Sequence, residues 1–294
     1  MAEIAVPLLP AIIRRGHQHE PGLTQPRTIA GGNGWSVADV LCTCGPDDPP
    51  YEEQHREFLV AFVIAGMFEQ RGAHGRTLMT PGAAMLGNPG ACFECSHTHA
   101  RGDRCVSFWY SEDYFDRILA DASMRGTAGG FSVDALPPLR ETTVLSTRAA
   151  AAISRPDDDE WDEFAAQVAI AAVGLTEHTV PSPAQVSRRA ESRVADAVRL
   201  IEENPEASLS LDVLARQAGM SPYHFLRVFN AVSGLTPHQY VRRARLRRAA
   251  VRLLVEPTRV IDVALDSGFR DVSNFNHAFR SEFGVSPRRY RQGQ

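Results

Sequence analysis

Hydrophobic residues recur with two different periods along the chain, and the change of period separates two kinds of structure. Between residues 35 and 110, short apolar runs end at turn-forming residues, which is typical of antiparallel strands. We predict strands at 35–44, 56–65, 76–79, 83–86, 92–99 and 105–110. From residue 112 onward, apolar residues recur at helical spacing and predict helices at 113–122, 144–153 and 163–175. The first part is therefore expected to be a small antiparallel sandwich or barrel with flanking helices.

The predicted helix 163–175 is rich in Ala and follows an acidic cluster at 157–160, where anions favour a helix N-terminus. Small side chains let two helices approach closely, so this helix is a candidate dimer contact. Alternatively, it covers one face of the sheet. The sequence leaves both possibilities open.

The last hundred residues contain one pattern twice, and each copy predicts a helix-turn-helix. Five residues recur at an offset of 50: Phe225, Phe229, Gly234, Pro237 and Tyr240 match Phe275, Phe279, Gly284, Pro287 and Tyr290. Ala215 and Gly219 recur at an offset of 49 as Ala264 and Gly268, so the difference of one residue falls in the turn. Ala allows two helices to cross closely, and Gly permits the sharp turn between them. The two copies span residues 210–232 and 260–283.

Local signals define the first copy further. Leu211, Leu214 and Ala215 are expected to face inward, while Ser221 caps the next helix and Pro222 begins it. In the second copy, Asp271 is the expected cap.

A long helix from about 237 to 254 connects the two copies and is rich in Arg. Its arginines are residues 242, 243, 245, 247, 248 and 252. So many cations on one helix cannot all be paired internally, so we expect contacts with phosphate groups. A solvated helix face is the alternative.

The net charge of -4 conceals a division between the two parts of the chain. From Arg188 onward there are 18 Arg against 11 acidic residues, a net charge of +7, whereas the first 187 residues carry -11. A basic C-terminal part on an acidic chain suggests an anionic partner for that part alone. No apolar run approaches the roughly 20 residues of a membrane span. At the N-terminus the Arg pair follows the apolar stretch, whereas in a secretory signal the basic residues come first. We expect a cytoplasmic protein that does not contact a membrane.

These patterns predict an α+β multidomain protein. Residues 1–178 form the strand-rich domain, 179–189 a linker with Pro and no apolar periodicity, and 190–294 an all-α domain with two helix-turn-helix units.

The stretch 191–291 resembles the AraC/XylS family of bacterial transcription regulators. The resemblance includes both helix-turn-helix units, the Arg-rich connecting helix and the closing phrase FNHAFRSEFGVSPRRYR at 275–291. It implies that the third and sixth helices of this domain enter successive major grooves of double-stranded DNA. The residues then expected to contact DNA are Tyr223, His224, Leu226, Arg227, Val272, Ser273, Asn276, His277 and Arg280.

Three of these positions suggest specific chemistry. Arg227 is suited to bidentate pairing with guanine and Asn276 to pairing with adenine, a phosphate contact being the alternative for each. Leu226 and Val272 stand where the family often has a polar side chain that contacts a base. Both apolar side chains suit the methyl group of thymine.

The resemblance also implies that the first part is a cupin-like β-barrel that senses a small-molecule effector and forms a homodimer. An activator of this family would also contact RNA polymerase. No catalytic triad, P-loop or dinucleotide fingerprint is present in the sequence, so we do not expect an enzyme. The alternatives are a metal-dependent cupin-type enzyme fused to a DNA-binding domain, and a constitutive regulator whose first part only dimerises.

A cluster of Cys and His in the first part suggests a metal site. On a strand, Cys95, His97 and His99 would project from one face, and a thiolate with two imidazoles suits zinc or another transition metal. The fourth ligand is undefined, with Cys92, Glu94 and His55 as candidates, although His55 fits a surface position better. His97 and His99 resemble the metal-binding histidine pair of cupins, but the glutamate that usually follows that pair is absent. A redox-responsive thiol, and structural or pocket-lining roles, therefore remain open.

Overall fold

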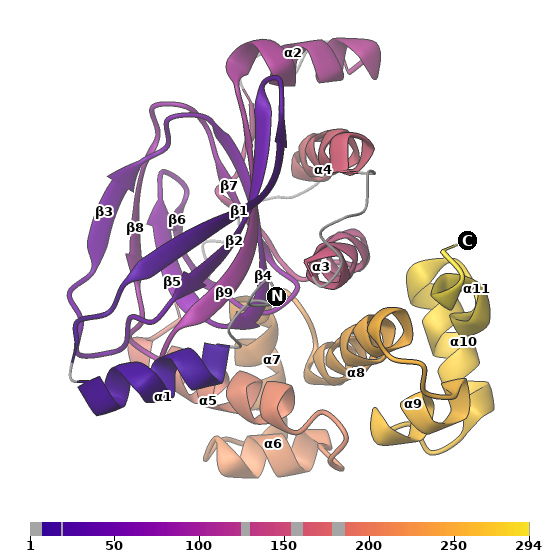
Figure 1. The fold of residues 1–294 in the computed structure, drawn as a ribbon. Coiled ribbons are helices and arrows are strands. Elements are labelled where there is room, and N and C mark those ends of the chain that lie inside the picture. Colours follow the sequence, from indigo (N-terminus) through magenta and orange to yellow (C-terminus); the bar gives the residue numbers. More distant parts are fainter. Residues whose placement is uncertain (1–7, 19, 125–129, 154–160, 178–185, 294) are drawn as a thin grey trace. The chain divides into compact units, whose positions relative to one another are not determined.

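The computed structural model describes residues 8–18, 20–124, 130–153, 161–177 and 186–293. Contacts divide the chain into an N-terminal unit, Met1–Pro183, and a C-terminal unit, Ala184–Gln294 (Figure 1). The acidic cluster predicted at 157–160 lies outside the described residues. No described helix is long and apolar enough to cross a membrane.

The N-terminal unit contains two antiparallel sheets. The larger has the strand order β1-β2-β9-β4-β7-β10 and the smaller β3-β8-β5-β6. The strands are β1 (Thr24–Gly32), β2 (Trp35–Cys42), β3 (Tyr51–Gln54), β4 (Phe58–Gly66), β5 (Phe68–Gly72), β6 (Gly75–Met79), β7 (Ala84–Gly87), β8 (Cys92–Ser96), β9 (Asp103–Tyr110) and β10 (Ala135–Leu136). The helices are α1 (Leu8–Gln18), α2 (Glu112–Asp121), α3 (Arg140–Ala152) and α4 (Trp161–Thr176).

Strand β4 shows why the larger sheet is apolar on both faces. Phe58, Val60 and Phe62 belong to a core shared with α2 and α4, whereas Leu59 and Ala61 belong to a second core with residues of the smaller sheet. Because side chains alternate along a strand, burial on both faces produces a continuous apolar run. The predicted sandwich or barrel with flanking helices is therefore observed as two sheets with helices against the larger one (Figure 1).

Helix α4 covers the larger sheet with its small residues. Ala165, Ala169 and Ala172 are at most 2% exposed and lie in the core beside the sheet. Of the two roles that the sequence left open for this segment, the structure places these alanines against the sheet of their own chain.

The C-terminal unit is entirely helical in its described residues. Its helices are α5 (Arg188–Glu203), α6 (Leu211–Gln217), α7 (Pro222–Ser233), α8 (Pro237–Val255), α9 (Val260–Asp266), α10 (Val272–Phe283) and α11 (Pro287–Arg291). The predicted all-α domain with two helix-turn-helix units agrees with this order.

The structure corrects several predicted boundaries. Strand β8 ends at Ser96 rather than residue 99, and α5 begins at Arg188, inside the predicted linker. Strands β1, β3, β5 and β10 and helix α1 were not predicted at all. Leu211 is 36% exposed rather than buried, because its position at the start of α6 leaves only Leu214 and Ala215 to fill the core.

Candidate nucleic-acid interface

The first helix-turn-helix is formed by α6, a tight turn and α7. Ala215 is fully buried where α6 meets its neighbours, and Gly219 adopts a φ of 60° in the turn, a conformation that Gly takes without strain. The Ser221 side chain then accepts a hydrogen bond from the His224 amide and so caps α7. The predicted cap, turn and small residue are all observed.

The second copy, α9–α10, repeats this geometry with different residues. Gly268 has a φ of 87°, and the Asp271 side chain accepts a hydrogen bond from the Asn274 amide at 2.7 Å. Helices α7 and α10 both end at a left-handed Gly, Gly234 and Gly284. The two copies therefore share their backbone plan.

An aromatic stripe anchors each second helix and determines which side chains face away. Phe225 and Phe229 on α7, like Phe275 and Phe279 on α10, are fully buried. Tyr240 packs edge-on against Phe229 with ring centroids 5.7 Å apart. Because residues four apart share a helix face, the two residues that follow the first Phe of each pair, 226–227 and 276–277, project elsewhere.

The predicted DNA-contacting residues lie on these other faces. Tyr223 is 78% exposed, and the others that are exposed are Arg227, Ser273, Asn276, His277 and Arg280. His224, Leu226 and Val272 are at least partly exposed. The structure thus brings the candidates into two groups, one on each second helix.

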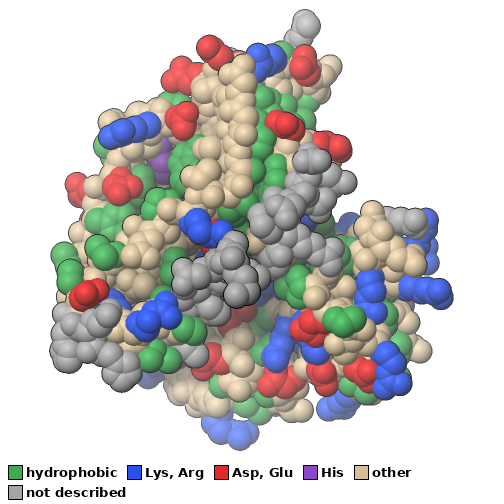
Figure 2. Space-filling view, in the orientation of Figure 1, with side chains coloured by type: hydrophobic (Ala, Val, Ile, Leu, Met, Phe, Trp, Pro, Cys, Tyr) green, Lys and Arg blue, Asp and Glu red, His purple; other side chains and the backbone are tan. Residues whose placement is uncertain are grey.

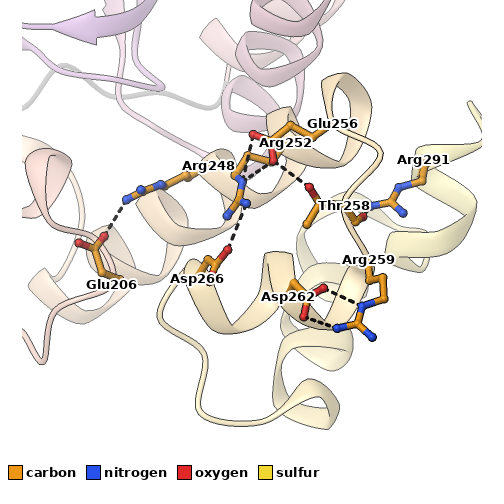
Figure 3. Close-up of polar contacts among 9 residues, drawn as sticks. All are labelled: Glu206, Arg248, Arg252, Glu256, Thr258, Arg259, Asp262, Asp266 and Arg291. Carbon is orange, nitrogen blue, oxygen red and sulfur yellow. Dashed lines mark hydrogen bonds and ion pairs between the residues drawn. The ribbon is translucent and has the colours of Figure 1, made fainter.

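The Arg-rich helix α8 differs from its prediction, because most of its arginines are paired within the protein. Arg248 binds Glu206 at 2.6 Å, and Arg252 binds both Glu256 and Asp266 (Figure 3). Arg243 binds the buried Glu282 of α10 at 2.8 Å. Internal carboxylates therefore pair with more of these cations than the sequence indicated, and the predicted phosphate contacts of this helix stay a prediction.

Two further arginines of α8 hold the end of α5 and the segment that follows it. Arg245 donates to the backbone carbonyls of Pro205 and Ala207, and Arg247 pairs with Glu202. Burial opposes the charge of Arg247, but the Glu202 carboxylate keeps its pKa above the usual value. Helix α8 is therefore tied to α5 and the loop before α6 through Arg245, Arg247 and Arg248, and to α9 and α10 through Arg243 and Arg252.

The charges of the C-terminal unit are accordingly mixed rather than uniformly basic. On the face shown in Figure 2, Arg side chains in blue alternate with Asp and Glu in red over this unit. Of the six arginines of α8, Arg242 and Arg245 have no ion pair with another described residue. Arg245 is held by two backbone carbonyls, whereas Arg242 is partly exposed. It is the α8 cation best suited to an external anion.

A cavity of about 780 Å³ lies in the N-terminal unit. Its wall combines aromatic and aliphatic side chains with polar and charged ones; among them are Tyr51, His55, Phe93, Cys95, Ser107 and Trp109. The ring of His55 stacks on Phe93 at 4.2 Å, and burial lowers the pKa of His55 to about 4. His55 was expected at the surface, but it is 7% exposed and lines this cavity.

The structure does not bring the predicted metal ligands together as expected. Because β8 ends at Ser96, His97 and His99 follow the strand instead of extending its face. Cys95 lies in the core between the sheets, and His99 Nε2 is 3.0 Å from Glu69 Oε1. The further candidates are also dispersed, since Cys92 is exposed and Glu94 lies 3.9 Å from Arg71.

His97 instead joins a buried network that the sequence did not indicate. Its Nε2 is 2.7 Å from Asp103 Oδ1, while Cys105 donates its thiol hydrogen to Asp103 Oδ2 at 3.3 Å. Burial opposes a charge on His97, but hydrogen bonds to Asp103 and Cys42 prevail and raise its pKa to about 9. At Cys42, burial raises the pKa of the thiol. Only the spacing Cys42-x-Cys44, at the end of a predicted strand, was available as a signal for this group.

Two helix-turn-helix units with outward-facing polar side chains define the class of the C-terminal unit, a helix-turn-helix protein. Comparison with known proteins agrees, since a family model described as a helix-turn-helix domain matches residues 214–293. The regulatory protein SoxS of Escherichia coli is 33% identical over 98 residues, covering 33% of this chain and 92% of SoxS. The chain belongs to the AraC/XylS family of transcription regulators.

Two other similar proteins illustrate the extent of the match. The transcriptional regulator MtrA of Neisseria gonorrhoeae is 32% identical over 102 residues, so the chain spans 34% of the length of MtrA and the match covers 35% of this chain. The crystal structure of the DNA-binding domain of AdpA with target DNA has 30% identity and a TM-score of 0.34, covering 34% of this chain and 91% of that domain.

Proposed function

We propose that this chain binds double-stranded DNA in a sequence-specific manner through α7 and α10 and thereby regulates transcription. The observation that carries the proposal is the repeated geometry of the two helices. Each exposes polar side chains beside a fully buried Phe pair, so each offers a rigid face to a major groove.

The side chains on these faces have distinct recognition chemistry. Arg227 is exposed on α7, and its fork of donors suits the O6 and N7 acceptors of guanine. Asn276 is exposed on α10 and suits the N6 and N7 groups of adenine. Ser273 and His277 offer further hydrogen bonds on α10, and Arg280 offers a phosphate contact. The two half-sites would therefore differ in sequence.

Selection of bound sequences from a random DNA pool by the purified full chain tests this proposal. We expect an asymmetric site whose two halves lie about one helical turn, roughly 10 base pairs, apart. The Arg227→Ala protein should select the same second half while losing preference at one position of the first. Failure of the unmodified protein to enrich any sequence would refute the proposal.

We also propose that the N-terminal unit binds a small organic effector in its cavity and so alters DNA affinity. The volume of about 780 Å³ lies within the usual range of small-molecule sites, and the aromatic part of the wall resembles the lining of such sites. The aromatic side chains favour a compact, largely apolar molecule, with His55 and Ser107 as its polar contacts. We infer that regulation operates in a homodimer and, for activation, through contact with RNA polymerase.

Two variants of strand β3 test the cavity. Glu53 lines the cavity, whereas Glu52, its neighbour on the same strand, does not. Compounds that stabilise the unmodified protein in a thermal-shift screen should lose their effect on Glu53→Trp and retain it on Glu52→Trp. Equal responses from the two variants would place the effector elsewhere.

A further inference from the structure

Three side chains converge in the N-terminal unit, those of Cys42, Cys44 and His97. One potential ligand atom from each lies within 4.8 Å of those of the other two. Cys42 is the last residue of β2, Cys44 follows two positions later, and His97 comes directly after β8. The three residues are 2%, 8% and 4% exposed, so this is a buried group and not a chance surface cluster.

The spacing of these atoms fits a metal ion. In a tetrahedral zinc site with bonds of about 2.3 Å to sulfur, neighbouring ligand atoms are about 3.8 Å apart. Atoms that already lie within 4.8 Å of one another need only small side-chain rotations to reach that geometry. Two thiolates and one imidazole are the donors preferred by zinc and other thiophilic ions.

Asp103 supplies the second feature of such a site. Its Oδ1 lies 2.7 Å from His97 Nε2, which leaves the other ring nitrogen of His97 available to a metal ion. A carboxylate that holds the remote nitrogen of a ligating His fixes the orientation of the ring and increases its basicity as a ligand. Asp103 is itself 5% exposed and is held by the Cys105 thiol, so this support is rigid.

The group also has a route to solvent. Cys42 and Asp103 both line the cavity of about 780 Å³. An ion held by three protein side chains beside this wall would have one coordination position left for a ligand that enters from the cavity. Three protein ligands with one open position distinguish exchangeable sites from closed structural sites.

We propose that Cys42, Cys44 and His97 bind a thiophilic divalent cation, with Zn²⁺ as the representative ion, and that Asp103 positions His97. The fourth coordination position faces the cavity and accepts water or a donor atom of a small molecule. This inference does not depend on DNA recognition, because it concerns metal binding by the N-terminal unit alone.

Cobalt substitution of the full chain tests the coordination directly. Protein stripped with chelator and kept reduced with a phosphine should take up one equivalent of Co²⁺. We expect a thiolate-to-cobalt charge-transfer band and the strong visible bands of four-coordinate Co²⁺, both removed by one equivalent of Zn²⁺. Only the weak spectrum of six-coordinate Co²⁺, or no uptake, would overturn the proposal whatever the variants show.

Substitutions then identify the ligands. Cys44→Ser and His97→Gln should each weaken Zn²⁺ binding at least 100-fold in competition with a chromophoric chelator, and Asp103→Asn should weaken it about 10–100-fold. Cys95→Ser is the matched buried control and Cys92→Ser the exposed one; both should bind as the unmodified protein does. If Cys95→Ser abolished binding while Cys44→Ser retained it, the assigned ligand set would be wrong. Circular dichroism confirms that each variant is folded.

Discussion

The first and second helix-turn-helix copies have the same skeleton and different surfaces. Both contain a buried Phe pair, a left-handed Gly in the turn and another after the second helix. In the first copy the second helix, α7, exposes Tyr223 and Arg227. In the second copy the corresponding helix, α10, exposes Ser273, Asn276 and His277. The difference shows that the repeat preserves the residues that determine backbone geometry and leaves the outward side chains to diverge.

The copies also differ in the length of the helix that comes after each reading helix. The first copy continues into α8, a helix of 19 residues, while the second ends with α11, a helix of 5 residues. Both begin in the same way, with a hydroxyl cap, a Pro and then a Tyr that packs on the second Phe of its copy. The longer helix, α8, contacts both copies. Its arginines bind residues near the end of α5 and residues of α9 and α10.

The largest expected effect concerns the shared skeleton. Phe229→Ala and Phe279→Ala should each reduce the free energy of unfolding by about 3–5 kcal/mol, because each removes a fully buried ring. Urea denaturation followed by circular dichroism measures the loss. Tyr223→Ala, at a highly exposed ring, should leave stability unchanged. A loss below about 1 kcal/mol at either Phe would show that the copies do not share this skeleton.

The next effect separates structural arginines from those available to DNA. Arg243→Gln should lower the free energy of unfolding by about 3 kcal/mol, since it leaves the Glu282 carboxylate buried without its cation. Arg242→Gln is the matched control on the neighbouring position. It should preserve stability and weaken DNA binding, with a smaller dependence of the binding constant on salt. A loss of stability in Arg242→Gln, with none in Arg243→Gln, would contradict these roles of the two arginines.

A third pair compares the two turns. At Gly268 an added Cβ would lie 2.6 Å from the Glu206 backbone, whereas at Gly219 it would meet only the Arg193 guanidinium at 3.8 Å. Both substitutions impose the left-handed conformation on Ala, at a cost of about 1 kcal/mol. The clash should add to this, so we expect roughly 2–3 kcal/mol for Gly268→Ala. Thermal denaturation of both variants provides the comparison, and equal losses would argue against the close approach at Gly268.

The smallest effect concerns the surfaces that differ. Arg227→Ala and Asn276→Ala should each remove about 1–3 kcal/mol of discrimination, at one base pair in different halves of the site. Binding measurements on a panel of single-base variants of the selected DNA determine this. Asn230→Ala, at an exposed position near the end of α7, is the control. A uniform loss over all sequences would identify a phosphate contact instead.

Local signals in the sequence were sufficient for the skeleton of both copies. Caps such as Ser221 and Asp271, turn glycines and Phe pairs four apart act over a few residues, so their spacing predicted α7 and α10 well. The strands were predicted less completely, because the weakly patterned β1 is defined by pairing with β2 and not by its own periodicity.

Interactions between distant residues were beyond sequence reasoning. Glu282 lies 39 positions from Arg243, and nothing in the sequence marks the two as partners. Likewise, the sequence grouped His97 with Cys95 and His99, whereas the structure places it beside Cys42 and Cys44, because the end of β8 depends on neighbouring strands and Cys42 comes from a strand far earlier in the chain. The sequence therefore indicated the residue types of the proposed metal site without indicating which of them meet.

The pairing of α8 arginines with both sides of the C-terminal unit has a consequence for how binding sites evolve. Helices α7 and α10 both pack against α8, so we expect the distance between them to change little. Inserting a single base pair between two half-sites would rotate one half by about 35° and displace it by about 3.4 Å, which a rigid reader cannot follow. If the protein reads DNA through α7 and α10 as we propose, its binding sites can exchange bases one at a time but cannot gain or lose a base pair between the two contacts.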